Sequence, residues 1–567
     1  MQDGSFTVSG SQEDYDRLLE AIGETNIPNV YHLWTAEQPH RTGTHFYETE
    51  LERGLLSLIY LSRSMQRKLR GKAHITIVSR MANAVLEGEA GNPHGAALLS
   101  LAKTLRTECT GYSFQCIDVE EGPLPVELIL SQTDTLMIAR RKGALYCPTL
   151  TQFPMEEAQP PQRGEGVCLI TGGTGSLGME LAGFITNVWK MPVCLVGHRA
   201  LPPREQWDAI VQEGTDSKLC RQITKLQELL EMGGDIVLRS ADCCDLTQMR
   251  EIVAQMTAQY GRIAGVFHLA GVAGDGFLYQ KPDEQLHRVL RPKMLGAMTL
   301  YEALQGQKPD CFVMYSSMQT AMGGAGQGDY TAANTFMNAY AEFLRAQDFP
   351  AYAICWPAWS EVGMAADYQV EAGTMLFAPL SPRQAMAALE SVLSHDIASL
   401  IPGRIEPEFL LRVGEENLPF ALSKRLSANL RAYGKQASAP AERTAHNTEN
   451  LQILGKETFT ETEIRTAHIY AAVLNLDEID IYAGFNSLGG NSIIATDLIE
   501  VLNGAFDNLL NVSDIFSYPS VEEMAAHIDD LRGQNTQTAG QEDILARFES
   551  GDLAVDEMLD YFKDDEV

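Results

Sequence analysis

A glycine-rich loop between an apolar run and a helical stretch constrains the fold of this chain most. The apolar run is Val167-Cys168-Leu169-Ile170, and the loop Thr171-Gly172-Gly173-Thr174-Gly175-Ser176-Leu177-Gly178 follows at once. A helical pattern then covers Met179 to Trp189. Glycines let a backbone approach a pyrophosphate, and a helix N-terminus offers free N–H groups and a positive dipole end to its oxygens. The order of strand, loop and helix predicts a Rossmann-like unit with a dinucleotide site.

The end of the next predicted strand, Val193 to Val196, bears on the choice of cofactor. An NAD site usually places a carboxylate there for the ribose 2′-hydroxyl. Here the strand runs into Gly197-His198-Arg199, and the Arg199 guanidinium can pair with a 2′-phosphate. We therefore expect NADPH. Asp242, after a later strand, is a candidate adenine contact, with a loop cap as the alternative. The expected contacts with the nicotinamide ribose follow a further strand: His268, Ala270 and Gly271.

Four side chains near residue 320 are of the types that carbonyl reduction needs. Ser317 lies 13 residues before Tyr330, and Asn334 lies four residues after it, one turn along a helix. Lys293 lies upstream. Reduction of a ketone adds a hydride to carbon and a proton to oxygen, and a tyrosine can supply the proton. A lysine cation lowers the tyrosine pKa from about 10, a serine hydroxyl holds the carbonyl oxygen, and an asparagine orients the lysine or a relay water.

The segments Tyr315-Ser316-Ser317 and Gly326-Gln327-Gly328-Asp329-Tyr330-Thr331-Ala332-Ala333-Asn334 resemble the active-site signature of ketoreductase domains in modular polyketide synthases. These domains belong to the short-chain dehydrogenase/reductase superfamily. The resemblance extends over roughly residues 15 to 425, because the Lys293 motif, the glycine loop and the stretch from Trp356 to Met364 match the same family. It implies that Tyr330 is the proton donor, that Ser317 hydrogen-bonds the carbonyl, and that Lys293 and Asn334 complete the tetrad.

The N-terminal 150 residues have an α/β pattern without a phosphate loop. Strands are expected at Val30 to Trp34 and Ile75 to Val78, and helices at Tyr47 to Lys68 and Ala96 to Glu108. The resemblance identifies this half with the family's structural subdomain, a degenerate Rossmann-like fold without cofactor. That subdomain normally begins with a further β-α-β portion. We therefore expect an N-terminally truncated subdomain, in a fragment of a longer polypeptide or with the missing piece on another chain.

Three features concern the substrate side of the site. The family usually has Trp-Gly-Pro-Trp where this chain has Trp356-Pro357-Ala358-Trp359. In the family, a tryptophan eight residues before the catalytic tyrosine marks one product class, and this position is Met322. The other class carries Leu-Asp-Asp, of which Asp275 matches the last residue. By this resemblance we expect the B-type outcome, a D-configured 3-hydroxyl. The segment from Ala365 to Leu380 is expected to form a substrate lid.

A second resemblance covers residues 457 to 531. The segment from Phe485 to Ile493, with Ser492 before a helix, resembles the modification site of acyl carrier proteins. A phosphodiester is favoured at a helix N-terminus, so Ser492 is expected to carry 4′-phosphopantetheine, and the alternative is a plain N-cap. Ile494, Leu498 and Leu502 are expected on the buried face of that helix. Asp497 and Glu500 suit docking to basic patches on partner enzymes.

The expected fold class is α/β, with two Rossmann-like subdomains followed by a small all-α carrier domain of four helices. The expected boundaries are residues 1–160 for the structural subdomain, 161–430 for the catalytic subdomain, 431–456 for a flexible linker, 457–532 for the carrier domain, and 533–567 for a second linker with an acidic helical tail. The tail is either a docking element or a solvated helix.

Composition excludes several classes of protein. The net charge of −32 argues against nucleic acid as a partner. No apolar run is long enough to cross a membrane and no secretory signal is visible, so membrane association is not expected. The ten scattered cysteines show no zinc spacing and favour buried thiols in a reducing, cytoplasmic compartment. We expect no metal site.

These features predict NADPH-dependent reduction of a 3-ketoacyl thioester tethered to the carrier. The alternatives are an inactive reductase scaffold that only presents the acyl chain, and an epimerase that uses the same tetrad. The expected partners are a ketosynthase and other assembly-line domains, an acyltransferase acting from elsewhere, and a phosphopantetheinyl transferase.

Overall fold

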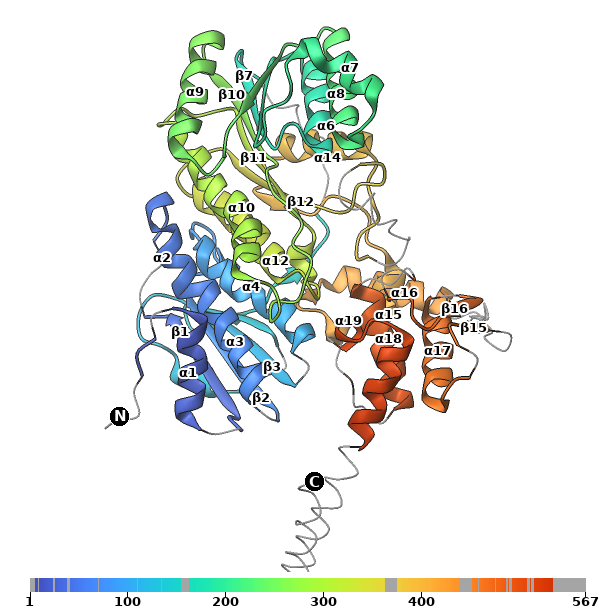
Figure 1. Cartoon of the computed structure of the whole chain (residues 1–567). Coiled ribbons are helices and arrows are strands. Elements are labelled where there is room, and N and C mark those ends of the chain that lie inside the picture. Colours follow the sequence, from blue (N-terminus) through green and yellow to red (C-terminus); the bar gives the residue numbers. More distant parts are fainter. Residues whose placement is uncertain are drawn as a thin grey trace, which may run out of the picture. The chain divides into compact units, whose positions relative to one another are not determined.

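A computed structural model of the chain (Figure 1) describes residues 6–8, 10–23, 26–37, 41–69, 71–109, 111–133, 135–153, 163–362, 375–437, 451–456, 458–474, 476–485, 488, 492–506, 510 and 514–533. The chain divides into two compact units, Met1–Ala439 and Pro440–Val567. This division falls inside the segment expected as the first linker.

The N-terminal part of the first unit contains a five-stranded sheet in the order β1-β2-β3-β4-β5. The pairs from β1 to β4 are parallel and β5 pairs antiparallel with β4. The strands are β1 (Asn29–Thr35), β2 (Ala73–Arg80), β3 (Tyr112–Val119), β4 (Met137–Arg141) and β5 (Ala144–Tyr146). The helices are α1 (Gln12–Ile22), α2 (Tyr47–Leu51), a π-helical turn (Glu52–Leu56), α3 (Ser57–Lys68), α4 (Pro93–Glu108) and α5 (Val126–Leu130). The two strands and two helices expected here are confirmed.

The second sheet has seven parallel strands in the order β13-β12-β11-β10-β7-β8-β9. The strands are β7 (Val167–Thr171), β8 (Val193–Gly197), β9 (Ile236–Ser240), β10 (Ile263–His268), β11 (Cys311–Ser317), β12 (Ala351–Trp356) and β13 (Ser399–Leu400). The strand order reverses beside β7, because the chain proceeds to β8 and β9 on one side and to β10, β11 and β12 on the other. In doubly wound folds ligands bind at this switch point, beyond the carboxyl ends of the strands.

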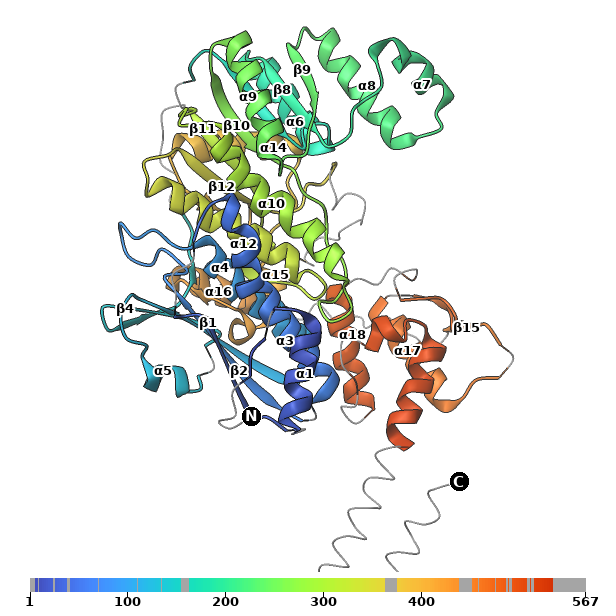
Figure 2. The ribbon, with the colours of Figure 1, turned by 60° about the vertical axis from the view of Figure 1, so that its left-hand side comes forward.

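Helices cover both faces of the seven-stranded sheet (Figures 1 and 2). One face packs against α9 and α10, and the other against α6, α8 and α14. The helices are α6 (Ser176–Phe184), continued by a π-helical turn (Ile185–Trp189), α7 (Trp207–Glu213), α8 (Ser217–Glu231), α9 (Leu246–Tyr260), α10 (Asp283–Ala303), α11 (Gln319–Met322), α12 (Gly328–Arg345) and α14 (Pro382–Ser394). The helix expected after the glycine loop is confirmed over its whole length.

One apolar core joins the N-terminal and catalytic parts. It contains Leu98, Leu101 and Leu105 of α4 together with Phe336 and Met337 of α12. Both views show α4 and α12 side by side (Figures 1 and 2). Because these residues belong to the same core, the position of α12, which carries the candidate catalytic tyrosine, depends on the part of the fold without a glycine loop.

The end of the first unit corrects the expected linker boundary. A short strand β14 (Ala421–Leu422) pairs with β6 (Thr149–Leu150), and two helices, α15 (Pro407–Val413) and α16 (Lys424–Ala437), lie nearby in sequence. Helix α16 extends beyond residue 431, so the first part of the expected linker is helical. Residues 438–450 lie outside the described residues.

The second unit contains the four expected helices and, in addition, a small sheet. The helices are α17 (Glu461–Leu474), α18 (Ser492–Ala505), α19 (Asp514–Ser517) and a helix over residues 521–533. Strands β15 (Gln452–Leu454) and β16 (Glu478–Asp480) pair in parallel, which corrects both the all-α description and the linker end at 456. Leu498 and Leu502 are buried as expected. The acidic tail beyond residue 533 lies outside the described residues.

Two further observations concern the cysteines and the length of the apolar helices. All ten cysteines are free, and most are buried. Among the described residues, no helix is both long and apolar enough to cross a membrane.

Candidate functional site

The glycine loop lies where β7 meets the switch point of the sheet. Gly172 adopts φ +68°, a left-handed conformation that glycine tolerates best. Gly175 precedes α6, and no side chain caps this helix at its N-terminus. The Gln222 side-chain amide donates to the Thr174 carbonyl oxygen over 2.7 Å and so helps to hold the loop. The loop therefore presents an uncapped helix N-terminus, as an anion site requires.

Two glycines in the loop leave no room for a side chain. A Cβ on Gly178 would lie 2.6 Å from both Cα and the carbonyl oxygen of Gly173. A Cβ on Gly173 would lie 2.7 Å from the carbonyl oxygen of Ile170 and 3.0 Å from Cα of Leu195. Helix α6 thus packs directly on the backbone of the loop and on β8. This close approach is what a dinucleotide needs, so these residues fit the expected cofactor.

The ends of β8 and β9 lie beside the loop. A Cβ on Gly197 would lie 2.7 Å from Oγ1 of Thr174, so Arg199, two residues later, extends from the edge of the sheet next to the glycine loop. Its side chain is exposed. Asp242 is exposed too, and its Oδ1 accepts from the Cys244 backbone N–H over 2.9 Å. The loop cap, the alternative for Asp242, is therefore present in the structure.

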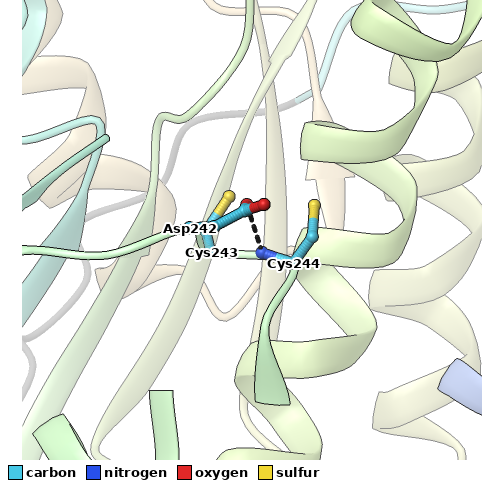
Figure 3. A group of neighbouring side chains, drawn as sticks. All are labelled: Asp242, Cys243 and Cys244. Atoms are coloured by element: carbon cyan, nitrogen blue, oxygen red, sulfur yellow. Dashed lines mark hydrogen bonds between the residues drawn. The ribbon is translucent and has the colours of Figure 1, made fainter. Parts of the chain in front are cut away.

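Asp242, Cys243 and Cys244 form a compact group of possible metal ligands (Figure 3). One ligand atom from each lies within 4.8 Å of the others. A thiol must lose its proton to bind a metal, and the hydrogen bond with Cys243, together with burial, raises the pKa of the Cys244 thiol. Its Sγ donates to the Arg291 carbonyl oxygen over 3.3 Å. These contacts are those of a packed turn, and we do not assign a metal site to this group.

The end of β10 connects the cofactor side of the site with the tetrad. His268 is fully buried, and its Nδ1 shares a 2.8 Å hydrogen bond with Oγ1 of Thr171. Burial lowers the pKa of His268 to about 3, so the imidazole is neutral. A Cβ on Gly271 would lie 2.8 Å from Cε of Lys293. Gly271 thus leaves space for the lysine stem. Ala270 lies beside Gly172: a Cβ added to Gly172 would lie 2.8 Å from the backbone nitrogen of Ala270.

The structure brings the four tetrad residues together. Ser317 is the last residue of β11, Lys293 lies in α10, and both Tyr330 and Asn334 lie in α12. The Lys293 ammonium is 5.7 Å from the ring centroid of Tyr330, and it donates to the Tyr315 carbonyl oxygen over 3.0 Å. The Asn334 amide donates to the Tyr330 carbonyl oxygen over 2.8 Å. Asn334 Oδ1 is buried and has no hydrogen-bond partner among the described residues.

The charges at the site differ from expectation at one point. Burial raises the pKa of the Tyr330 phenol, while hydrogen bonds with the side chains of Ser317 and Asn334 act in the opposite direction. The pKa of Tyr330 is thus raised and not lowered as expected, and the Lys293 ammonium donates to the Tyr315 carbonyl oxygen. Burial lowers the pKa of Lys293 itself to about 8. A raised tyrosine pKa keeps the phenol protonated, which suits a proton donor.

The surroundings of Asp275 and Met322, the two residues expected to bear on stereochemistry, are different. Burial mainly raises the pKa of the Tyr330 phenol, and the negative charge of Asp275 adds to this effect. The Gln327 side-chain amide donates to Asp275 Oδ1 over 3.4 Å. Met322 ends α11 and packs against an apolar cluster that includes Leu376 and Phe377.

The Trp356-Pro357-Ala358-Trp359 segment packs tightly beyond β12. The two indole rings meet edge to face at 5.5 Å, and neither indole N–H has a partner among the described residues. Most of the expected lid, residues 365–374, lies outside the described residues. Its end is described: the Leu380 N–H donates to the Ala358 carbonyl oxygen over 2.8 Å.

Ser492 is the first residue of α18, as expected for the carrier attachment site. The side chains of Ser492, Ile494, Asp497 and Glu500 lie outside the described residues.

Sequence reasoning missed a buried ion pair next to the tyrosine, Lys281 with Asp329. Forty-eight residues separate the two, and no periodic pattern connects them.

Three family models match the chain. Residues 166–361 match the KR domain, residues 467–528 match the phosphopantetheine attachment site, and residues 2–135 match a model described as beta-ketoacyl synthase-like, N-terminal. The last match includes β1, β2 and β3 of the five-stranded sheet and ends before β4.

The curated relatives are large synthases. Polyketide synthase PksL of Bacillus subtilis (strain 168) is 26% identical over 532 residues, covering 88% of this chain and 11% of that protein. The 6-methylsalicylic acid synthase of Aspergillus terreus is 28% identical over 400 residues, covering 67% of this chain and 22% of that protein. The chain thus spans less than a quarter of the length of either.

Solved structures of ketoreductases share the fold. An A1-type ketoreductase superposes with a TM-score of 0.61 at 21% identity and covers 76% of this chain and 88% of that one. A ketoreductase domain from the bacillaene assembly line gives a TM-score of 0.55 at 24% identity and covers 68% of this chain and 94% of that one. The first of these similarities covers more of the chain than the matched KR range does. The chain therefore carries a KR domain over residues 166–361, on a fold shared with solved ketoreductases, followed by a phosphopantetheine attachment site over residues 467–528.

Proposed function

We propose that this protein reduces a 3-ketoacyl thioester, tethered to 4′-phosphopantetheine on Ser492, to a 3-hydroxyacyl thioester with NADPH. The observation that carries the proposal is the meeting of Ser317, Tyr330, Lys293 and Asn334 beside a glycine loop at the switch point of the sheet. The chain has the expected residue type at each of these four positions.

Each residue has a role that its surroundings support. NADPH, when bound, supplies the hydride. The Ser317 hydroxyl, at the end of β11, donates a hydrogen bond to the ketone oxygen, and the Tyr330 phenol transfers its proton there. Lys293 then returns a proton to the phenolate, since its own pKa of about 8 is close to neutral. Asn334 Oδ1, buried without a partner among the described residues, accepts from a water or from the lysine in this relay.

NADPH rather than NADH is supported by charge. The end of β8 offers the exposed Arg199 guanidinium and no carboxylate, and a 2′-phosphate pairs with a planar guanidinium. The B-type, D-configured product is supported by Asp275 near Tyr330 and by the absence of tryptophan at Met322. The same residues would suit epimerisation, which consumes no net NADPH.

The test is oxidation of NADPH by the full chain with a 3-ketoacyl thioester surrogate. We expect turnover that disappears in Tyr330→Phe while cofactor binding persists. No turnover with bound NADPH would support the inactive scaffold, and exchange of the α-hydrogen without NADPH oxidation would support the epimerase. Mass spectrometry of the intact protein after treatment with a phosphopantetheinyl transferase tests Ser492, because the modification and the gain of two mass units on reduction are both visible.

A further inference from the structure

Four buried charged side chains, none of them in the tetrad, lie in or against the loop over residues 272–282. Arg63 and Glu108 come from the N-terminal part, Lys281 belongs to the loop itself, and Asp329 is the residue before the catalytic tyrosine. Their exposed fractions are 7%, 4%, 4% and 0%. A buried charge is costly unless it is paired and hydrogen-bonded. Each of the four side chains therefore needs hydrogen-bond or ion-pair partners inside the fold.

Glu108, the last residue of α4, joins two loops of the catalytic part. One carboxylate oxygen accepts from the Leu278 N–H and the other from the Gly326 N–H, each over 2.9 Å. Leu278 lies in the 272–282 loop, and Gly326 lies just before α12. Burial raises the pKa of Glu108 to about 7. A single carboxylate of the N-terminal part thus fixes the spacing between the two loops.

Arg63, in α3, holds the same loop through its carbonyl oxygens. Its guanidinium donates to the Leu278 carbonyl oxygen over 2.7 Å and to the Lys281 carbonyl oxygen. A third N–H group donates to the Asp283 carboxylate over 2.8 Å. Leu278 is therefore bound at both its N–H and its carbonyl by residues of the N-terminal part.

The Lys281–Asp329 ion pair connects this loop to the catalytic tyrosine. The lysine ammonium donates to both carboxylate oxygens, over 2.9 and 2.8 Å, and to the Gly274 carbonyl oxygen over 3.0 Å. Asp329 Oδ1 also accepts from the Tyr330 backbone N–H over 2.9 Å. Gly274 precedes Asp275, so the ion pair links the backbone beside Asp275 with the backbone of Tyr330.

We propose that Glu108, Arg63, Lys281 and Asp329 are positioning residues that set Asp275 relative to Tyr330 and thereby determine which face of the ketone meets the hydride. The proposal rests on the ketoreductase function proposed above. It assigns a specific role to the part of the fold without a cofactor site: Arg63 of α3 and Glu108 of α4 hold the loop that carries Asp275.

The chain offers a matched control for general effects of buried charge. Arg141 and Asp118 form a second buried pair, 1% and 2% exposed, with a 3.0 Å contact. Asp118 also accepts from the backbone N–H groups of Ala82 and Asn83. All these contacts lie within the N-terminal part, so Asp118→Asn removes the same charge as Asp329→Asn without touching the 272–282 loop.

The experiment compares the full-length chain with Glu108→Gln, Asp329→Asn and Asp118→Asn. Glutamine has the same shape as glutamate, but its NH₂ group would face one of the two backbone N–H groups that now donate hydrogen bonds to the Glu108 carboxylate. Two quantities are measured: the D-to-L ratio of the 3-hydroxyacyl product, and hydrogen exchange in residues 272–282 and 323–329. Lys281→Met/Asp329→Leu, which leaves no unpaired buried charge, is included in case a single variant does not fold.

We expect Glu108→Gln and Asp329→Asn to change the D-to-L ratio by about tenfold, the effect of about 1.4 kcal/mol, and to raise exchange in both segments. Asp118→Asn should change neither quantity. An unchanged product ratio in folded variants, or equal exchange in all variants, would overturn the proposal. Absence of turnover by the unaltered chain would instead refute the ketoreductase function, and the exchange data alone would then decide whether these residues position the loop.

Discussion

Replacement of Gly178 by alanine tests the cofactor site most directly. The new Cβ would lie 2.6 Å from Cα and the carbonyl oxygen of Gly173 and 2.7 Å from the carbonyl oxygen of Gly172. Non-bonded carbon atoms prefer about 3.5 to 4.0 Å, so α6 and the loop must separate by about 1 Å. All three neighbouring atoms belong to the backbone, and no side-chain rotation can relieve the overlap.

The consequence for binding follows from the hydrogen bonds that the displaced loop would lose. A hydrogen bond to a charged group contributes about 1.5 to 3 kcal/mol, so the loss of one phosphate contact weakens binding by about 10- to 150-fold. The assay is titration of NADPH fluorescence with the full chain. We expect the Kd for NADPH to rise by that factor in Gly178→Ala.

Gly183→Ala provides the control in the same helix. Its Cβ would meet only Cδ2 of Leu229, at 3.0 Å, the end of a side chain that can turn. Alanine in a helix interior is more favourable than glycine by about 1 kcal/mol, so this variant should bind NADPH as the unaltered chain does. An unchanged Kd in Gly178→Ala would refute the account of the loop as a close backbone contact with the cofactor.

Four further predictions concern individual groups. Tyr330→Phe should lower kcat by about 10²- to 10⁴-fold and leave the Kd for NADPH unchanged in the same titration. Because burial lowers the pKa of Lys293 to about 8, the ammonium loses its proton as pH rises through that value, and a pH–rate profile should show kcat falling above it; a flat profile up to pH 10 would contradict this role. Arg199→Ala should raise KM for NADPH by about tenfold, the loss of one guanidinium–phosphate contact, and leave KM for NADH unchanged; equal changes for both cofactors would contradict the assignment. Ser492→Ala should abolish the mass increase from phosphopantetheinylation but preserve reduction of a free thioester surrogate.

Glu108 also predicts a dependence of stability on pH. Its folded pKa, about 7, lies above the ordinary value of 4.5, so the folded state holds the proton more tightly than the unfolded state does. The contribution of this group to stability is therefore fully present below about pH 4.5 and is lost as pH rises through about 7. Thermal unfolding of Glu108→Gln, whose side chain does not titrate, should show a smaller loss of stability over this interval.

The elements of the catalytic part could be predicted because their signals are local. The apolar run of β7, the glycine loop and α6 are contiguous, and the i, i+4 relation of Tyr330 and Asn334 is a property of one helix. The expected linker failed for the same reason. Its polar composition indicates a flexible segment, but α16 continues to Ala437 and β15 begins at Gln452, because pairing and packing with distant segments override composition.

The sequence by itself indicated a Rossmann-like unit, with a candidate tetrad of residues, ahead of a helix that begins at Ser492. Only the tertiary structure decided the direction of the Tyr330 pKa, the partners of Lys293, and the bridge from Glu108 to Leu278 and Gly326. Glu108 and Gly326 are 218 residues apart, and both are brought together by the core shared between α4 and α12. Such contacts leave no periodic trace along the chain, because their geometry depends on how α4 and α12, from two distant parts of the sequence, pack against each other.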